Sequence, residues 1–162
     1  MTTCLKTING FSVNGRVYKE GLDMKLNPDC IRDTLLKIEV DQVYEDEFGL
    51  QLKTLSGIQL LRTDLSQKYT QGEILYTVKQ LHDSGLVSAC PYNAGPTLDF
   101  VIRDITPIGH EFLNNVRSDT VWANTKGIAK KIGVGTLKGL VEISSKIIGE
   151  VIAAYLKKNS AI

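Results

Sequence analysis

Apolar positions at helical spacing predict a first helix that begins near residue 28. Ile31, Leu35 and Ile38 recur four and three positions apart and give the segment one apolar face. The preceding residues, Asn27-Pro28-Asp29, place a good N-cap before a proline that suits the first helical position, with an acidic residue in the first turn. The sequence therefore predicts a helix start at Pro28.

A second helix is predicted where the run Thr70-Gln71-Gly72-Glu73 forms a capping box. Glycine at position 85 can take the left-handed conformation that often ends a helix, so we expect the helix to stop there. Its apolar positions fall at helical spacing and would face the core: Ile74, Leu75, Val78 and Leu81.

Strand patterns lie on both sides of this second helix. Residues 49–61 alternate weakly and predict one or two short strands. Residues 86–90 and 97–105 are strand-like runs around the turn-rich stretch 91–96, which predicts a β-hairpin. In the second run, Leu98, Phe100 and Ile102 are expected on one face, and Asp99, Val101 and Arg103 on the other.

Three further helices are predicted after the hairpin. Thr106 and Pro107 begin a short one, and Ser118 precedes another that runs to about Ile132. Thr136 caps the longest helix of the chain, which has a wide apolar stripe. The order of helix, strand, helix and β-hairpin predicts an α+β fold, a winged helix-turn-helix domain with a small antiparallel sheet, followed by C-terminal helices.

Three stretches of the chain resemble an uncharacterised family of bacterial and prophage proteins, the YjcQ-like winged-helix group of unknown function. They are Met24 to Asp33, Tyr69 to Val87 and Ile105 to Lys126, of which the last is the most specific. The resemblance extends from Met24 to the C-terminus. It implies the winged-helix fold and a phage or prophage origin, and it implies no substrate.

The chain divides into three parts on this interpretation. Residues 1–23 form an N-terminal extension centred on Asn14-Gly15, a dipeptide typical of a type I′ turn, and are either a β-hairpin or a loosely held arm. Residues 24–117 form the winged-helix domain. Residues 118–162 form a C-terminal helical segment whose long helix either packs back on the domain or serves as a dimerisation helix.

The composition argues against several classes of function. The two histidines, His82 and His110, and three scattered cysteines without CxxC spacing do not suggest acid–base catalysis, a metal site or a disulfide framework. We therefore expect no enzyme, no metal and no cofactor. The sequence lacks an apolar run long enough to span a bilayer and a signal-peptide pattern, so we expect a cytoplasmic protein that does not bind membranes.

The formal net charge of +1 hides an uneven distribution. Residues 41–125 hold six basic and eleven acidic residues, whereas residues 126–162 hold seven basic and two acidic ones. The region that contains the predicted recognition helix and wing is therefore acidic, and the C-terminal segment is basic. Because non-specific DNA affinity comes largely from phosphate contacts, this distribution weakens the usual expectation that a winged helix binds DNA.

DNA is nevertheless the first predicted partner, with transcriptional regulation as the function. The helix after Thr70 would be the recognition helix, the hairpin would be the wing, and lysines of the basic segment would contact phosphates. The nucleic-acid-binding candidates are Gln71, Thr77, Lys79, Gln80, His82, Tyr92, Asn93, Arg103, Lys126, Lys130 and Lys131.

Two further partners are predicted. A second copy of the chain would pair through the long helix, with candidate interface residues Leu137, Leu140, Val141, Ile147, Ile148, Val151, Ile152 and Tyr155. The alternative to DNA binding is a protein-interaction module that binds a host or phage protein, for example to interfere with a defence system. The acidic central region favours this alternative.

Overall fold

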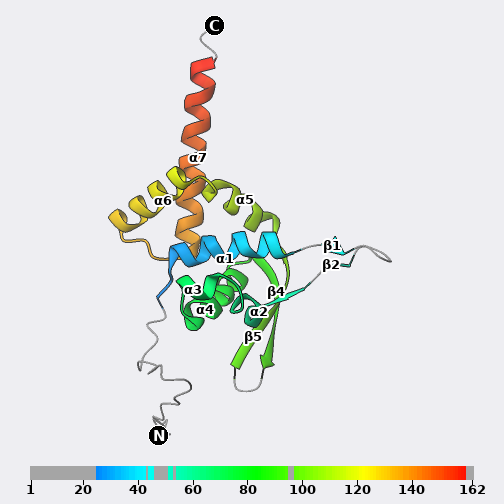
Figure 1. Cartoon of the computed structure of the whole chain (residues 1–162). Coiled ribbons are helices and arrows are strands. Elements are labelled where there is room, and N and C mark those ends of the chain that lie inside the picture. Colours follow the sequence, from blue (N-terminus) through cyan, green and yellow to red (C-terminus); the bar gives the residue numbers. More distant parts are fainter. Residues whose placement is uncertain (1–24, 43, 46–50, 53, 95–96, 160–162) are drawn as a thin grey trace, which may run out of the picture.

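The computed structural model describes residues 25–42, 44–45, 51–52, 54–94 and 97–159 (Figure 1). The extension expected for residues 1–23 lies outside these residues. The elements in chain order are α1 (Pro28–Asp41), β1 (Tyr44–Glu45), β2 (Gln51–Leu52), β3 (Leu55–Ser56), α2 (Gly57–Leu60), α3 (Leu65–Lys68), α4 (Gln71–Asp83), β4 (Val87–Ala94), β5 (Thr97–Ile105), α5 (Pro107–Val116), α6 (Asp119–Ile132) and α7 (Leu137–Asn159).

The fold is α+β with a small antiparallel sheet and C-terminal helices, as the sequence predicts. The sheet has the strand order β3-β5-β4, and β1 pairs separately with β2. Figure 1 shows α1 crossing the middle of the molecule, with α3 and α4 on one side and α5 and α6 on the other. The β4–β5 hairpin extends away from the helices.

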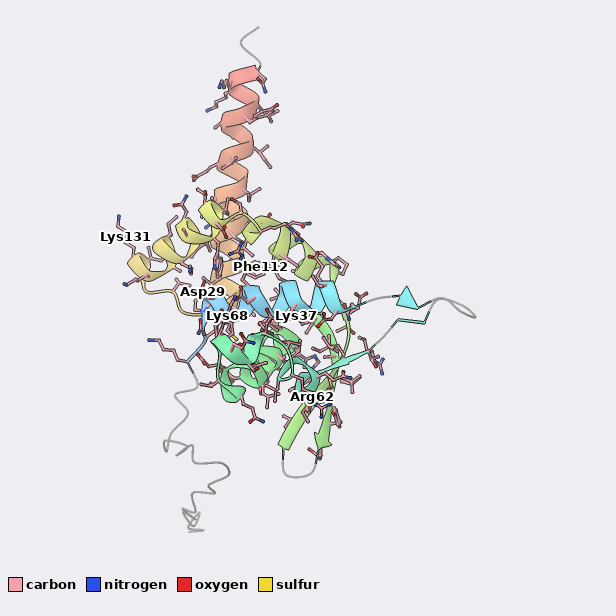
Figure 2. The ribbon with its side chains drawn as sticks, in the orientation of Figure 1. Asp29, Lys37, Arg62, Lys68, Phe112 and Lys131 are labelled. Atoms are coloured by element: carbon pink, nitrogen blue, oxygen red, sulfur yellow. The ribbon has the colours of Figure 1, made fainter. Side chains whose placement is uncertain are left out.

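One hydrophobic core joins α1, α4, the sheet and α5. The predicted apolar face of α1 is confirmed, and so is that of α4 at Ile74, Val78 and Leu81, which are fully buried, whereas Leu75 is only half-buried. The core residues include Ile31, Leu35, Ile38, Ile74, Val78, Leu81, Phe100, Ile102, Phe112, Leu113 and Val116. Phe112, labelled in Figure 2, comes from α5 and places that helix in the same core.

The predicted helix ends are confirmed by their hydrogen bonds. The Asn27 side chain accepts from the backbone N–H of Asp29 (3.1 Å), and Thr106 accepts from the N–H of Gly109 (3.1 Å). Gly85 has φ +71°, the left-handed conformation expected after α4. These local devices fix where α1, α4 and α5 begin or end.

The segment predicted as strand near residue 57 is partly wrong. β3 covers Leu55–Ser56, but Gly57–Leu60 forms the short helix α2. The reason is a second capping box: the Ser56 hydroxyl accepts from the N–H of Gln59 (3.1 Å), and the Gln59 side chain accepts from the N–H of Ser56 (2.7 Å). Capping chemistry here overrides the weak alternation.

The predicted faces of β5 also need a correction. Phe100 and Ile102 are buried as expected, but Leu98 is 46% exposed and Asp99 is fully buried. Asp99 lies against α2, where its carboxylate accepts hydrogen bonds from the backbone N–H of Ile58 (3.3 Å) and of Phe100 (2.7 Å). A buried carboxylate with such donors is satisfied, so the sheet can bury it.

Candidate nucleic-acid interface

The N-terminus of α4 is already occupied by a side-chain carboxylate. Thr70 accepts from the N–H of Glu73 (3.2 Å), and the Glu73 carboxylate accepts from the N–H of Thr70 (2.9 Å) and from the side-chain amide of Asn27 (3.0 Å). The hydrogen bonds from Asn27 and then from Thr70 lower the pKa of Glu73. A phosphate bound at this helix end would lie beside the Glu73 carboxylate, so the N-terminus of α4 is not an open anion-binding site.

We expect Glu73→Gln to destabilise the fold at pH 7 by about 0.5–1 kcal/mol, because a charge-assisted interaction at the helix N-terminus becomes neutral. The folded-state pKa of Glu73 is lower than the usual value of 4.5, so its contribution is present above that value and is lost as pH falls through the folded pKa. Urea unfolding at neutral and acid pH measures the free energies of unfolding of Glu73→Gln and the unaltered protein. The difference between these free energies should be smaller at acid pH. A difference independent of pH would contradict this origin.

The outward face of α4 carries little net charge. Gln71 is exposed and Gln80 is half-buried, so both amides are accessible. Lys79 forms an ion pair with Asp83 one turn later. The ion pair neutralises the one lysine of the helix, so α4 by itself presents polar groups but no excess positive charge.

Two of the candidate DNA-contacting residues on α4 are less exposed than expected. Thr77 is buried, and its hydroxyl donates to the sulfur of Cys30 on α1 (3.3 Å), so its expected exposure is wrong. The physical reason is its place on the buried face, three residues after Ile74. His82 is half-buried, with its ring 5.5 Å from the ring of Phe100, and so it packs towards the sheet.

The hairpin presents the predicted wing residues at the surface. Tyr92, Asn93 and Arg103 are exposed. The Tyr92 hydroxyl donates to the buried carboxylate of Asp99 (2.6 Å), and this hydrogen bond raises the pKa of Tyr92. The β4–β5 hairpin therefore has an aromatic side chain held in place by the sheet and one exposed cation further along β5.

A hollow lies between the second half of α4 and the start of α7. It brings together three segments that are distant in sequence, and two of its residues are lysines. Its lining residues are Lys25, Leu26, Tyr76, Gln80, Ser84, Gly135, Thr136, Leu137 and Lys138. Within the described part of the chain, no carboxylate lies within 4 Å of the amino group of Lys25 or Lys138. The hollow supplies the positive charge that the outward face of α4 lacks.

Of the hollow's polar residues, only Gln80 belongs to the candidates named from the sequence. Lys25, Tyr76 and Ser84 were missed, whereas Lys138 belongs to the basic segment 126–162 whose lysines were expected to contact phosphates. Lys25 precedes α1, Tyr76 and Ser84 belong to the α4 region, and Lys138 lies in the first turn of α7. No local pattern links these positions, and only the tertiary fold brings them together.

The predicted lysines of α6 are not among the residues that line the hollow. Lys126 pairs with Asp29 on α1 (2.6 Å) and lies over the ring of Trp122 (5.6 Å), whose indole N–H also donates to Asp29 (2.8 Å). Lys130 and Lys131 are exposed. Figure 2 shows Lys131 at the outer end of α6, pointing away from the rest of the molecule.

The candidate dimer residues of α7 fall into two groups. Leu137 and Leu140 are buried against the chain's own core, so their assignment to a dimer interface is wrong. Val141, Ile147 and Ile148 are half-buried. Val151, Ile152 and Tyr155 are more than half exposed. Only the second half of α7 thus has an apolar surface left to contact another molecule.

Two classes of site are absent from the residues that the structure describes. None of their helices is long and apolar enough to cross a membrane. These residues also contain no cluster of three histidine, cysteine or acidic side chains that could hold a metal ion.

Comparison with known proteins gives one family and one relative. A family model described as "Hypothetical protein (DUF2513)" matches residues 25–135. An uncharacterised protein of Haemophilus influenzae (strain ATCC 51907 / DSM 11121 / KW20 / Rd) is 28% identical over 131 residues, which cover 80% of this chain and 100% of the relative. No solved structure matches the chain significantly.

Proposed function

We propose that this chain, which belongs to the DUF2513 family, is a winged-helix protein that binds duplex DNA. Two features support the winged-helix assignment: α1, β3, the short helices, α4 and the β4–β5 hairpin follow one another in the order typical of that fold, and the strand order is β3-β5-β4. In this proposal α4 is the recognition helix and the hairpin is the wing. The resemblance of three stretches to YjcQ-like proteins supports the same assignment.

The observation that carries the proposal is the position of Lys25 and Lys138 beside Gln80. The glutamine amide can read a base edge, whereas the two lysines that line the same hollow can contact phosphates. The exposed ring of Tyr92 adds a contact from the wing. We infer that the protein regulates transcription in a phage or prophage context, in the cytoplasm where its DNA lies.

A protein-interaction module is the second candidate function. The Lys79–Asp83 ion pair and the carboxylate of Glu73 at the helix end favour it, because both reduce the attraction of α4 for phosphate. On this alternative the same face of α4 and the hollow would contact a host or phage protein, without DNA.

Fluorescence anisotropy with labelled duplex DNA at two salt concentrations tests the proposal. We expect binding that weakens as salt rises, and we expect the double variant Lys25→Gln/Lys138→Gln to lower affinity about ten-fold. Its log–log salt slope should fall by about 1.8 in magnitude, the value for two lost phosphate contacts.

The matched control is Lys146→Gln/Lys157→Gln, which removes two positive charges from α7 at positions outside the hollow. This control should bind like the unaltered protein. The variant Lys130→Gln/Lys131→Gln tests the α6 lysines separately. Absence of binding at low salt would overturn the DNA proposal, and capture of a protein that survives nuclease treatment and depends on α4 would favour the alternative.

A further inference from the structure

The second half of α7 projects from the domain. In the first half, Leu137, Leu140, Ile143 and Ser144 are buried, and the helix contacts α5 and α6. Residues 149–159 are exposed throughout. Figure 1 shows this part of α7, coloured red, projecting away from all other elements.

The projecting half is amphipathic. Ile148, Val151, Ile152 and Tyr155 follow the spacing i, i+3, i+4 and i+7, so they lie on one face of the helix. The exposed fractions are 55% for Val151, 53% for Ile152 and 67% for Tyr155. The opposite face has charged residues: Lys146, Glu150 and Lys157.

This exposed face continues the face that packs the helix onto its own domain. Positions 137, 140, 144, 148, 151 and 155 are separated by three or four residues throughout, so they follow one side of α7. The first three are buried by α5 and α6, whereas the last two are open to solvent. A helix of about a dozen residues with water on all sides is only marginally stable, so the stripe favours a covering partner.

We propose that a second copy of the chain covers this stripe, so that two projecting halves of α7 pair about a twofold axis. Within residues 147–156 the only charged residue is Glu150, on the polar face. The residues beside the stripe, Ser145, Gly149 and Ala154, are uncharged and small. Two copies can therefore bring residues 148–155 of this face together closely without opposing like charges, and an antiparallel arrangement also separates the two copies of Lys158, which follows Val151 by seven residues on the same side.

Charge and area both fit this occupant. A helix that binds an anionic lipid or nucleic-acid surface has a polar face rich in cations, whereas here the only charge along residues 147–156 is the carboxylate of Glu150. The exposed stripe offers on the order of 400 Å² per copy, about half of what a standard stable interface buries on each partner. An interface of this size is weak, so we expect the dimer to form only at micromolar or higher concentrations. It does not depend on whether α4 binds DNA.

Sedimentation velocity of the full chain across roughly 1–200 µM tests the dimer, since this range brackets a micromolar dissociation constant. We expect the mass to rise from 17.9 kDa towards twice that value as concentration increases. The variant Val151→Asp/Tyr155→Asp should raise the dissociation constant at least about 30-fold, because four carboxylates would meet in the interface.

Ala153→Asp is the matched control, since it adds a carboxylate to the opposite face of the same helical turn. It should dimerise like the unaltered chain. Both sites are exposed, so circular dichroism should show a folded domain in all proteins, and helix content should fall only by the unpaired turns of α7 in Val151→Asp/Tyr155→Asp. A monomer at every concentration, a dimer insensitive to Val151→Asp/Tyr155→Asp, or monomers that sediment with anionic vesicles would overturn the proposal.

Discussion

Gly109→Ala is expected to destabilise the protein by about 3 kcal/mol, a large part of the free energy of unfolding of a typical domain. A Cβ at this position would lie 2.0 Å from the backbone oxygen of Leu86 and 2.7 Å from Cγ2 of Ile105. The Leu86 oxygen also accepts hydrogen bonds from the N–H (3.0 Å) and the hydroxyl (3.2 Å) of Thr106. The first turn of α5 is therefore fixed against the α4–β4 connection, and it cannot move away without losing these bonds.

Thermal unfolding measures this effect, and about 3 kcal/mol corresponds to a midpoint roughly 6–12 °C lower for a chain of this length. Gly127→Ala provides the matched control, because Gly127 lies inside α6 with no heavy atom within 4 Å of an added Cβ. This control should stabilise the fold by about 0.5–1 kcal/mol through helix propensity. Equal midpoints for the two variants would mean that α5 does not pack closely against the Leu86 carbonyl.

The boundaries of α1, α4 and α5 were predictable from the sequence because capping is a local interaction. Asn27, the Thr70–Glu73 pair, Gly85 and Thr106 each act within about four residues, and each does in the structure what its residue type indicates. The apolar faces of α1 and α4 were predictable for the same reason, since helical spacing alone defines them.

The surroundings of individual side chains on these elements were less predictable. Thr77 could be placed on α4 from the sequence, but whether it faces solvent depends on Cys30, which lies 47 residues earlier. Tyr76 and Lys138 likewise line one hollow only because α7 begins beside α4. Such contacts depend on how the helices pack, and no periodicity within one segment encodes them.

Asp99 is the clearest case of a residue whose role the local pattern misassigns. Alternation along β5 predicts a solvent-facing aspartate, but α2 covers that face of the strand. A Cβ added at Gly57 would lie 2.4 Å from Oδ1 of Asp99, so the glycine leaves the space that the carboxylate needs. The carboxylate links α2, β5 and Tyr92 of the β4–β5 hairpin, which connects the core of the sheet to the proposed DNA-binding surface.

We therefore expect Asp99→Asn to destabilise the fold by about 2–3 kcal/mol, because either orientation of the amide places its NH₂ group against a backbone N–H and leaves that donor without an acceptor. Asp104→Asn makes the same chemical change on an exposed residue of the same strand. Its free energy of unfolding should be within about 0.5 kcal/mol of that of the unaltered protein. Tyr92→Phe should destabilise the fold less than Asp99→Asn does, because it removes one hydrogen bond of a side chain at the surface. Urea unfolding measures the free energy of unfolding of all three variants. If Asp99→Asn is as stable as Asp104→Asn, the carboxylate does not hold α2 and the β4–β5 hairpin together.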